Sequence, residues 1–364
     1  MTNRLRVALT LEQCWHRVPG GTASSILELV KELSTRTDVD VRGVAARHRR
    51  LPADPWIPAV PVHTLALPRR ALYETWHYLR WPPVEAATGP VDVVHATTLA
   101  IPPKRAPLVV TIHDLVFLHD PTQVTRHGLR FFRRGLALAL RDADLVLVPS
   151  RATWSDCQEA GFSADRLRLV PHGVSVPEVS AEQAADFRFR YGISRPYILW
   201  CGTLEPRKNL PALVAAYDRL RGRVPDVELV LVGPRGWGDV RIDPVPGVRL
   251  LGFLPPHDLH AAYAGARAFC YPSLREGFGL PVLEAMAHGV PVVTSADSAM
   301  AEFAGDAALL ADPRDVDGLA AALAAAIGER HDDLAAAGRA RAATYTWEAA
   351  AQKTVAAYRE VAGR

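Results

Sequence analysis

The chain has 364 residues, of which 49% are hydrophobic and 22% charged, and its formal net charge is +3. This composition is typical of a soluble globular protein, and the length exceeds what one hydrophobic core usually covers, so we expect two domains. The small charge does not support nucleic-acid binding, and the sequence lacks the run of about 18 apolar residues that a membrane span needs.

The four cysteines have no metal-ligand spacing and lie in or beside apolar segments, so we expect them to be reduced and structural. Residues 4–9 alternate and then become apolar, which predicts a buried strand rather than a secretory signal. We therefore expect a cytoplasmic protein. Gly20-Gly21-Thr22 then opens an amphipathic helix. Glycines such as Gly21 at this turn can admit a phosphate or an acceptor group, or they can only make a tight turn, and the full GxGxxG motif is absent.

Further apolar runs predict strands at residues 39–44, 62–67, 91–95, 108–113, 145–149 and 167–170. Helical patterns lie between them, which predicts a doubly wound parallel sheet with ligands bound beyond the carboxyl ends of its strands. His113-Asp114 stands at such an end. A neutral imidazole there can donate a hydrogen bond to a sugar hydroxyl, and the alternative is a histidine that only caps the strand.

Two stretches, residues 68–83 and 126–141, are both basic and aromatic. The second has an apolar helical stripe surrounded by arginines, and the stripe consists of Leu129, Phe132, Leu136 and Leu140. Such a helix can lie on an anionic membrane surface and present an acceptor site to a lipid. A surface helix with one buried stripe is the more common outcome, and both interpretations stay open.

The pattern loosens between His172 and Pro196, which predicts a linker after a first domain over residues 1–172. A second alternation follows, with predicted strands at residues 197–201, 227–232, 248–251, 268–271, 290–294 and 307–310. We therefore expect a second doubly wound domain over residues 196–346. The predicted helices that end the chain cover residues 319–329, 333–344 and 347–361.

The segment GTLEPRKNL, residues 202–210, follows the first strand of the second domain and is predicted to open a helix. Arg207 and Lys208 are two adjacent cations at that helix start, where the helix dipole disfavours positive charge, so a compensating anion is expected. Arginine can bind a phosphate through two hydrogen bonds and lysine adds a point charge, so the pair can neutralise a diphosphate. The alternative is a pair of exposed surface cations.

Residues 269–294 predict a strand, a loop, a helix and another strand. Pro281 suits the first position of the helix and Gly289 the left-handed position after it. The loop Gly277-Phe278-Gly279-Leu280 lets the backbone approach a ligand closely and leads into a helix N-terminus, which favours a phosphate.

Two carboxylates flank this phosphate site, Glu276 in the loop and Glu284 on the helix. When ionised, each can accept hydrogen bonds from sugar or ribose hydroxyls. Taken singly, Glu276 could equally be a solvated loop acid, and Glu284 could only complement the helix dipole.

The string EGFGLPVLEAMAHGVPVV is similar to the signature of the retaining, nucleotide-sugar-dependent glycosyltransferases of family 4 (glycosyl transferases group 1), whose two glutamates are likewise separated by seven residues. TIHDL, GTLEPRKNL, LVLVGPRGWGD and VRLLGFLPPHDL also resemble family segments. The resemblance implies an α/β protein of the GT-B architecture, with two doubly wound Rossmann-like domains facing across a cleft. The first would be the acceptor domain, onto which the last helix, 347–364, packs back, and the second the donor domain.

The resemblance implies transfer of a hexose from a nucleoside diphosphate sugar to a hydroxyl, with retention at the anomeric carbon and without a metal or other cofactor. Glu276 and His113 would hold the hexose, Glu284 the ribose, and Arg207 and Lys208 the diphosphate. The expected catalytic residues are His113, Glu276, Arg207 and Lys208. The expected donor-binding residues are Gly21, Gly202, Thr203, Gly233, Phe253, Leu254, Gly277, Phe278, Gly279, Leu280 and Glu284, with the amides of Phe278 and Gly279 on the diphosphate.

The sequence departs from one family variant, which has an arginine directly after the glycine where Thr203 stands, so Arg207 and Lys208 would supply that charge alone. No residue is an obvious nucleophile towards the sugar. We therefore expect front-face displacement, in which the departing diphosphate accepts the acceptor's proton.

The PRKN and TIHDL versions of these motifs resemble bacterial mannosyltransferases of polysaccharide or glycolipid assembly, which implies GDP-mannose as the donor. UDP-dependent glucosyl or N-acetylglucosaminyl transfer stays open, because the base would be contacted chiefly by backbone. A non-hydrolysing UDP-sugar epimerase and a non-catalytic nucleotide-sugar sensor are further alternatives. The expected partners are a nucleotide sugar and a hydroxyl acceptor, either a glycan, a lipid-linked glycan or a small molecule, and not nucleic acid. Contact with the inner face of the membrane stays open.

Overall fold

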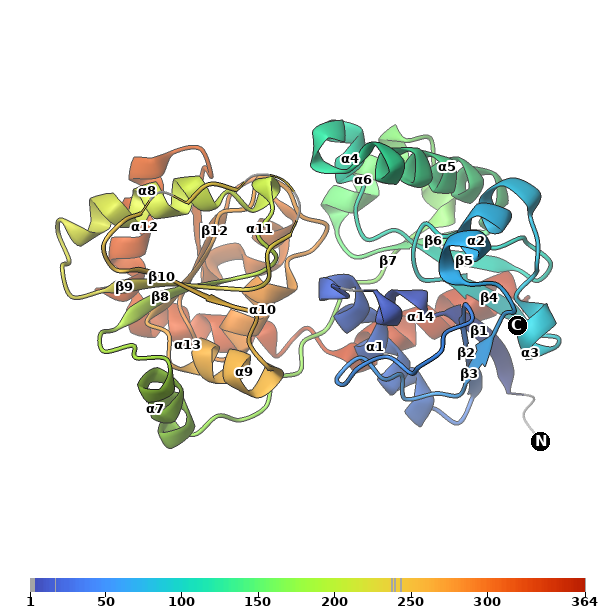
Figure 1. Cartoon of the computed structure of the whole chain (residues 1–364), viewed down its shortest axis with the longest axis horizontal. Helices are drawn as coiled ribbons and strands as arrows, with labels where there is room; N and C mark the ends of the chain where they lie inside the picture. The colour runs from blue at the N-terminus through green and yellow to red at the C-terminus, as the bar shows by residue number, and fades with distance from the viewer. Residues whose placement is uncertain (1–3, 17, 237, 239, 243, 364) are drawn as a thin grey trace. The chain divides into compact units, whose positions relative to one another are not determined.

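The computed structural model describes residues 4–16, 18–236, 238, 240–242 and 244–363. The chain divides into two compact units (Figure 1). Unit 1 comprises residues 1–173 together with 347–364, and unit 2 comprises residues 174–346. The segment predicted to be a linker contains helix α7 (Ala181–Arg190), which packs against α9 (Pro256–Ala264) and belongs to unit 2.

Unit 1 contains a parallel sheet of seven strands in the order β3-β2-β1-β4-β5-β6-β7. Its strands are β1 (Leu5–Thr10), β2 (Val39–Ala45), β3 (Val62–Thr64), β4 (Val93–Ala96), β5 (Leu108–Thr111), β6 (Leu145–Val148) and β7 (Leu167–Leu169). The central strands β4, β5 and β6 are short, mainly apolar runs buried on both faces, as expected for a parallel sheet covered by helices, whereas the edge strand β3 has no buried residue.

Helices cover both faces of this sheet (Figure 1). On one face α1 (Gly20–Thr35) packs against α14 (Trp347–Val361), which also contacts β5 and β6. On the other face, α2 (Arg69–Glu74), α5 (Arg126–Asp142) and α6 (Arg151–Glu159) share a hydrophobic core with alternate strand residues. Unit 1 also contains two short helices, α3 (Glu85–Thr88) and α4 (Val116–His119), and a π-helical turn, Thr75–Leu79.

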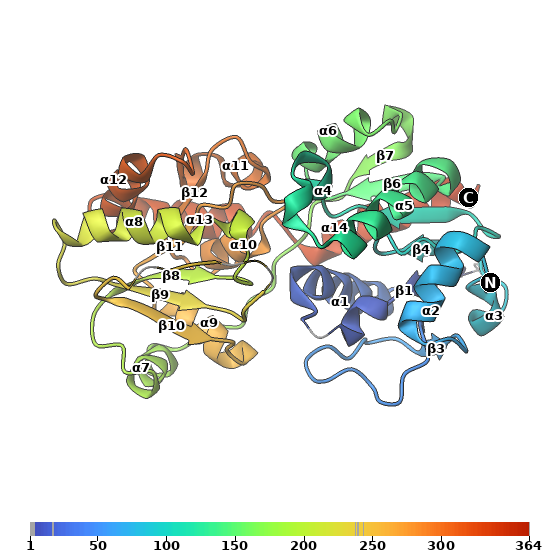
Figure 2. The ribbon, with the colours of Figure 1, turned by 45° about the horizontal axis from the view of Figure 1, so that its top comes forward.

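Unit 2 contains a parallel sheet of six strands in the order β10-β9-β8-β11-β12-β13. Its strands are β8 (Tyr197–Cys201), β9 (Glu228–Val232), β10 (Val248–Gly252), β11 (Ala268–Tyr271), β12 (Val292–Ser295) and β13 (Leu309–Ala311). Its remaining helices are α8 (Leu210–Arg221), α10 (Leu280–Ala287), α11 (Ala299–Ala304), α12 (Val316–Ile327) and α13 (His331–Ala342). Figure 2 shows α8 and α12 on one face of the sheet and α9 on the other.

Both sheets are doubly wound, as the alternation of strands and helices predicted. The four cysteines are buried and unpaired, which agrees with the prediction that they are structural. Within the described residues, no helix is both long enough and apolar enough to cross a membrane.

Candidate active site

The strand order of unit 2 reverses between β8 and β11, because the chain moves from β8 outwards to β10 and then returns to β11 on the other side. In open parallel sheets, ligands bind beside the loops that follow the strands at such a point. The loop after β8 carries Lys208, and the loop after β11 carries Glu276. The fold brings these side chains together across 68 positions of sequence, with 2.6 Å between Lys208 Nζ and Glu276 Oε1.

Arg207 and Glu205 complete a charged cluster with this pair. Arg207 Nη1 lies 2.6 Å from Glu276 Oε2, and Arg207 Nε lies 3.1 Å from Glu205 Oε2. The side chains of Lys208 and Glu276 are only 8% and 9% exposed. Lys208 Nζ also donates a hydrogen bond to the phenolic oxygen of Tyr271 at 2.5 Å. Two cations and two carboxylates therefore neutralise one another in a largely buried place.

The neighbouring cations decide the charge of Glu276. Burial alone would raise the pKa of its carboxyl group, but the charges of Arg207 and Lys208 outweigh burial and lower that pKa to about 2. Burial lowers the pKa of Lys208, and the charge of Glu276 opposes this shift. Glu276 is therefore ionised at neutral pH, and the anion that the sequence required beside the two cations is supplied by the chain's own carboxylates.

The prediction that Arg207 and Lys208 stand at a helix start was wrong. They lie in a 3-10 turn, Pro206–Lys208, and α8 begins only at Leu210. Asn209 separates the two elements because its backbone is left-handed, with φ of +58°. Its side-chain amide fixes this turn by donating to the carbonyl oxygens of Pro272 and Pro313, at 3.2 and 2.7 Å.

The glycine-rich loop enters α10 through Gly279, whose φ is +103°. A Cβ atom at Gly279 would lie 2.4 Å from Cγ of Met300, so both the backbone and the space require glycine. The helix begins at Leu280, with Pro281 in its first turn, and Gly289 takes the predicted left-handed conformation after it. Because the first amides of a helix have no acceptor inside it, this helix end can bind an anion.

Phe278, in the same loop, has its side chain in the core. Its ring centroid lies 4.9 Å from that of Phe303, and both rings are buried. Any contact of Phe278 with a ligand would therefore be through its backbone, as the sequence analysis expected.

Glu284 lies on α10 and differs from Glu276 in its electrostatics. Its Oε2 accepts a hydrogen bond of 3.0 Å from the hydroxyl of Tyr263. Burial raises its pKa to about 7, more than that hydrogen bond lowers it. Glu276 is therefore ionised at neutral pH, whereas Glu284 changes its charge near neutral pH. That the two glutamates accept hydrogen bonds from sugar and ribose hydroxyls stays a prediction.

Glycines end the neighbouring strands β8, β9 and β10. Gly233 N–H donates to the carbonyl oxygen of Gly252 at 2.8 Å, and a Cβ atom at Gly233 would lie 1.8 Å from the carbonyl oxygen of Gly202. Backbone therefore lies against backbone at this edge of the sheet. Of the other residues expected near the base, Phe253 is 63% exposed and Leu254 is buried in the core. Thr203 is half-buried in the loop after β8.

His113 and Gly21 are the predicted site residues that belong to unit 1. His113 follows β5, and its Nε2 donates a hydrogen bond to the carbonyl oxygen of Thr97 at 3.0 Å, because a carbonyl can only accept. Burial lowers the pKa of His113 more than this bond raises it. The neutral ring has no second N–H, so the prediction that it donates to a sugar hydroxyl was wrong: Nδ1 is left to accept.

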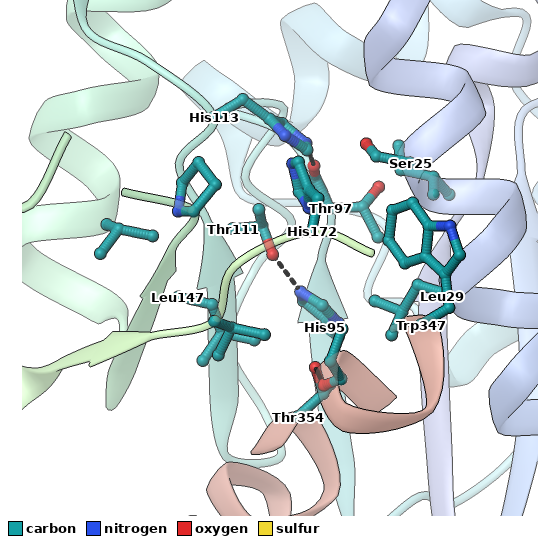
Figure 3. A pocket seen from close by; sticks show the side chains of 15 residues that line it. Ser25, Leu29, His95, Thr97, Thr111, His113, Leu147, His172, Trp347 and Thr354 are labelled. Carbon is teal, nitrogen blue, oxygen red and sulfur yellow. Dashed lines mark hydrogen bonds between the residues drawn. The ribbon is translucent and has the colours of Figure 1, made fainter. Parts of the chain in front are cut away.

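A cavity of about 30 Å³, enough for a water molecule, lies beside His113 at the carboxyl ends of β4 to β7 (Figure 3). Its polar lining includes Thr97, His95 and His172, and burial lowers the pKa of both these histidines to about 3. His95 joins β4 to its neighbours through bonds of 2.7 Å to the Thr111 hydroxyl and the Tyr358 hydroxyl. The cavity is therefore lined by neutral histidines.

His172 was not among the predicted site residues. It follows β7 at the same edge of the sheet as His113, and the rule that weights residues after strands could have found it. Gly21 lies exposed in the first turn of α1, and a Cβ atom there would meet nothing within 4 Å, so the fold does not require glycine.

One group of metal-type side chains was found among the described residues: His119 of α4 with Asp156 and Glu159 of α6. His119 Nε2 lies 2.9 Å from Asp156 Oδ1, a contact that ties α4 to α6. None of the three lines the cavity beside His113.

Comparisons with known proteins agree along most of the chain. Residues 195–329 match the family described as glycosyl transferases group 1, and residues 19–178 match glycosyltransferase family 4. O-antigen chain mannosyltransferase B of Escherichia coli is 35% identical over 285 residues, which cover 73% of this chain and 74% of that protein. Phosphatidyl-myo-inositol mannosyltransferase of Mycolicibacterium smegmatis is 29% identical over 373 residues, covering 95% of this chain and 92% of the relative.

Among solved structures, Anabaena Alr3699/HepE in complex with UDP and glucose has a TM-score of 0.74 and 20% identity, over 97% of this chain and 99% of that one. WaaG, a glycosyltransferase involved in lipopolysaccharide biosynthesis, has a TM-score of 0.72 and 18% identity, over 98% and 100%. These likenesses show a shared fold of two Rossmann-like domains. The chain therefore belongs to the group 1, family 4 glycosyltransferases of GT-B fold, and it is a hexosyltransferase that resembles mannosyltransferases.

Proposed function

We propose that this enzyme transfers mannose from GDP-mannose to a hydroxyl group in polysaccharide or glycolipid assembly, with retention at the anomeric carbon. Relatives named as mannosyltransferases support the choice of sugar. The observation that carries the site assignment is the charged cluster at the switch point of unit 2, where Arg207 and Lys208 contact Glu276. A diphosphate is the part of such a donor that calls for two cations.

Donor binding exchanges partners within the cluster. A phosphate oxygen takes the place of Glu276 on Lys208, and Arg207 binds the diphosphate through its planar guanidinium. The released carboxylate of Glu276 then accepts hydrogen bonds from hexose hydroxyls. The two cations thereby keep an anionic partner, and the buried carboxylate of Glu276 keeps hydrogen-bond donors, which offsets part of the cost of separating it from them.

Two further groups serve the donor. The positive end of α10, at Gly279 and Leu280, favours the diphosphate. Glu284 accepts hydrogen bonds from the ribose hydroxyls when it is ionised, and with a pKa of about 7 it is only partly ionised at neutral pH. The backbone at Gly233 and the exposed ring of Phe253 border the base.

The reaction is a front-face displacement. The bond between the anomeric carbon and the phosphate oxygen breaks, and its electron pair stays with the departing diphosphate. The acceptor's oxygen bonds to the same carbon on the same face, and its proton passes to the departing phosphate oxygen. Arg207 and Lys208 stabilise the negative charge that develops there. In unit 1, Nδ1 of His113 accepts a hydrogen bond from a hexose hydroxyl.

Incubating the protein with single nucleotide sugars tests the donor. GDP-mannose, UDP-glucose and UDP-N-acetylglucosamine are supplied without an acceptor, and slow hydrolysis is followed by mass spectrometry. We expect GDP and mannose from GDP-mannose alone, and much less of both from a Glu276→Gln variant. Hydrolysis of a UDP-sugar only would overturn the donor assignment. Conversion to an epimer would indicate an epimerase, and binding without turnover even with acceptors present would indicate a sensor.

We also propose that unit 1 contacts an anionic membrane surface through the turn after α2. Tyr78, Leu79 and Trp81 are 60%, 72% and 56% exposed there. Arg80 fixes the turn, because its guanidinium donates to the carbonyl oxygens of Trp76, Ile101 and Pro102 at 2.6 to 2.8 Å. Its backbone is left-handed, with φ of +53°. The exposed rings are thus held by a rigid turn.

Helix α5, which contacts the π-helical turn Thr75–Leu79, adds arginines to this surface. The guanidinium of Arg134 lies 5.5 Å from the ring centroid of Tyr78, and Arg126, Arg130 and Arg133 are exposed on α5. Amphipathic rings beside cations suit the headgroup region of an anionic bilayer. The contact would bring the enzyme to a lipid-linked acceptor.

Co-sedimentation with vesicles tests this surface. We expect binding to phosphatidylglycerol vesicles, little binding to phosphatidylcholine, and about a tenfold loss when Leu79→Ser is combined with Trp81→Ala, because both side chains leave the bilayer. Phe189→Ser is the matched control, since this ring on α7 is 86% exposed but lies in unit 2. An equal loss in the control, or no loss in the double variant, would overturn the assignment.

A further inference from the structure

Tyr263 carries a buried hydroxyl group for which the proposed reaction has no role. The residue lies on α9 in unit 2 and is 0% exposed. Its phenolic oxygen lies 3.0 Å from Oε2 of Glu284 and 3.2 Å from Sγ of Cys201. Cys201 is the last residue of β8, directly before Gly202 at the carboxyl edge of the sheet. The hydroxyl therefore lies between two elements of the proposed donor site, β8 and α10.

The ring of Tyr263 is held by two other rings. Its centroid lies 5.4 Å from that of Phe269 and 5.7 Å from that of His288, and the planes of Tyr263 and His288 differ by only 11°. His288 follows the last residue of α10 and contacts His260 of α9, with 3.0 Å between Nε2 and Nδ1. Burial lowers the pKa of both histidines, so the pair is neutral and one ring donates to the other. These contacts join α9 to α10 and fix the position of the phenolic oxygen.

The hydroxyl proton can be donated to only one partner at a time. Burial raises the pKa of Tyr263 well above its usual value, so the phenol keeps this proton. An ionised carboxylate is a stronger acceptor than a thiol sulfur, so Tyr263 donates to Glu284 whenever Glu284 is ionised. When Glu284 is protonated, the hydroxyl can turn to Cys201. It therefore has a partner in both charge states of Glu284, which avoids the cost of a buried polar group without one.

The bond to Tyr263 occupies one carboxylate oxygen of Glu284 and leaves the other for a ligand. Within the described residues, no hydrogen bond to Oε1 was found. Each carboxylate oxygen has two lone pairs, so Oε1 can accept from two neighbouring hydroxyl groups, such as the 2′ and 3′ hydroxyls of a ribose. A phenyl ring at position 263 would fill the same space without burying a polar atom, so packing alone does not explain the hydroxyl.

We propose that Tyr263 is a positioning residue that makes the donor site selective for ribose. Its hydroxyl holds Oε2 of Glu284, so that Oε1 accepts the 2′ and 3′ hydroxyls of the donor, and Tyr263 itself does not touch the donor. A nucleoside diphosphate with deoxyribose leaves Oε1 with fewer hydrogen-bond donors and binds more weakly. The inference rests on the proposed function, because it takes Glu284 as the residue that contacts the ribose.

Calorimetry with GDP and 2′,3′-dideoxy-GDP tests this selectivity. It is carried out at about pH 8, where most of Glu284 is ionised. We expect the wild type to bind GDP about thirtyfold more tightly than the dideoxy compound. In Tyr263→Phe this ratio should fall to about threefold, chiefly because GDP binds more weakly. UDP and 2′,3′-dideoxy-UDP are measured in parallel, so that the test does not depend on the base.

Tyr217→Phe is the matched control. Tyr217 of α8 is a buried tyrosine of the same unit, and its hydroxyl donates to the carbonyl oxygen of Val227 at 2.9 Å, at the amino end of β9. This variant also loses one buried hydrogen bond, so its unfolding free energy should fall while its nucleotide ratio stays that of the wild type. If Tyr263→Phe does not fold, Tyr263→Met replaces it, because a flexible apolar side chain fills the space without a hydroxyl.

Steady-state kinetics give a second readout that general damage to the fold would not produce. With the donor that the hydrolysis test identifies, Tyr263→Phe should raise the KM for the donor by about tenfold and leave kcat unchanged. The reason is that the ribose is remote from the anomeric carbon, so its contacts are the same in the ground state and the transition state.

The outcomes separate this inference from the proposed function. Equal affinity of the wild type for the ribose and dideoxyribose nucleotides, or a wild-type ratio in Tyr263→Phe, would overturn the inference and leave the proposed transfer reaction intact. An equal fall of the ratio in Tyr217→Phe would also overturn it. Absence of GDP and UDP binding together with absence of nucleotide-sugar turnover would instead overturn the proposed function.

Discussion

The two units place different side chains at the same edge of nearly the same scaffold. Each has a parallel sheet whose order reverses beside its first strand, between β1 and β4 in unit 1 and between β8 and β11 in unit 2. The carboxyl edge of the sheet in unit 2 holds the charged cluster around Lys208 and Glu276. The same edge in unit 1 holds the neutral rings of His95, His113 and His172. The fold therefore does not decide the chemistry, and the residues after the strands do.

The difference follows from the cost of burying charge. A buried charge needs a partner, and in unit 2 Glu276 and Glu205 are the partners of Arg207. Under the proposed function these carboxylates take the place of the diphosphate when no donor is bound. In unit 1, burial keeps the histidines neutral, so that edge suits hydroxyl groups rather than phosphates. Under the proposed function, unit 2 binds the anionic part of the donor and unit 1 a hydroxyl group.

Glu276→Gln should give the largest effect. The amide removes the negative charge that the hexose contact requires in the transition state, so we expect turnover to fall by about 100-fold or more while GDP binding persists. Rates with GDP-mannose and calorimetry with GDP measure the two quantities. Glu205→Gln is the control, because Glu205 contacts Arg207 in the same cluster but has no proposed contact with the hexose. Unchanged turnover in Glu276→Gln would remove this residue from the site.

His113→Ala tests the other side of the comparison. We expect kcat to fall by about tenfold, because one hydrogen bond to the hexose is lost, and the Kd of GDP to stay the same. His127→Ala, an exposed histidine on α5, is the control. Weaker GDP binding in His113→Ala would mean that the two units do not divide the donor as proposed.

Lys208→Met should weaken GDP binding by about tenfold, because a charge-assisted contact to phosphate is lost while the apolar stem is kept. Arg207 still pairs with Glu276 in this variant, which limits damage to the fold. Isothermal titration calorimetry gives the affinity, with the exposed Lys353→Met as the control. An unaltered dissociation constant would contradict the diphosphate assignment.

The smallest expected effect is a pH dependence of the unfolding free energy, to which Glu284 and Glu276 contribute with opposite signs. The pKa of Glu284 in the folded chain, about 7, lies above the usual value of about 4.3, so its stabilising contribution is complete below the usual value and is lost as the pH rises through 7. The pKa of Glu276, about 2, lies below it, so its contribution is present above the usual value and is lost as the pH falls towards 2.

Urea unfolding between about pH 5 and pH 8 measures how the contribution of Glu284 to the unfolding free energy changes with pH. Buried histidines such as His95 and His172, whose pKa is lowered to about 3, make the unfolding free energy rise with pH up to their usual pKa of about 6.5. We therefore expect the unfolding free energy of Glu284→Gln to rise more steeply with pH than that of the wild type, because the opposing contribution of Glu284 is lost. The exposed Glu329→Gln should keep the wild-type slope. An identical slope in Glu284→Gln and the wild type would show that Glu284 titrates near its usual pKa.

The sequence predicted local elements well where apolar runs have clear ends. The strands at Tyr197–Cys201 and Ala268–Tyr271 and the helix at Trp347–Val361 have the predicted bounds. The strand predicted at 290–294 instead covers Val292–Ser295, because apolar residues before a strand look the same as those in it. The start of α8 was missed because one left-handed residue, Asn209, separates it from the turn before it.

Contacts across the sheet could not be predicted in the same way. The pairing of Lys208 with Glu276 depends on β8 lying beside β11, which is a property of strand order and not of either segment. The hydrogen bond from His113 to the carbonyl oxygen of Thr97 depends on the backbone of another loop. The sequence therefore carries no sign that this N–H is already used, and the prediction that it donates to a sugar hydroxyl was wrong. His172 was missed although its place after β7 could have indicated it, and its ring contact with His113 has no sequence motif.

Because of helix α14, the two units can finish folding at different stages of synthesis on the ribosome. Unit 2 is one continuous segment, whereas unit 1 needs a helix that is made only after all of unit 2 has emerged. Until then the apolar surface that Trp347, Val355 and Tyr358 later cover is exposed, and His95 lacks one of its hydrogen-bonding partners. The second unit in the sequence can therefore finish folding first, and moving α14 in front of β1 by circular permutation would reverse that order.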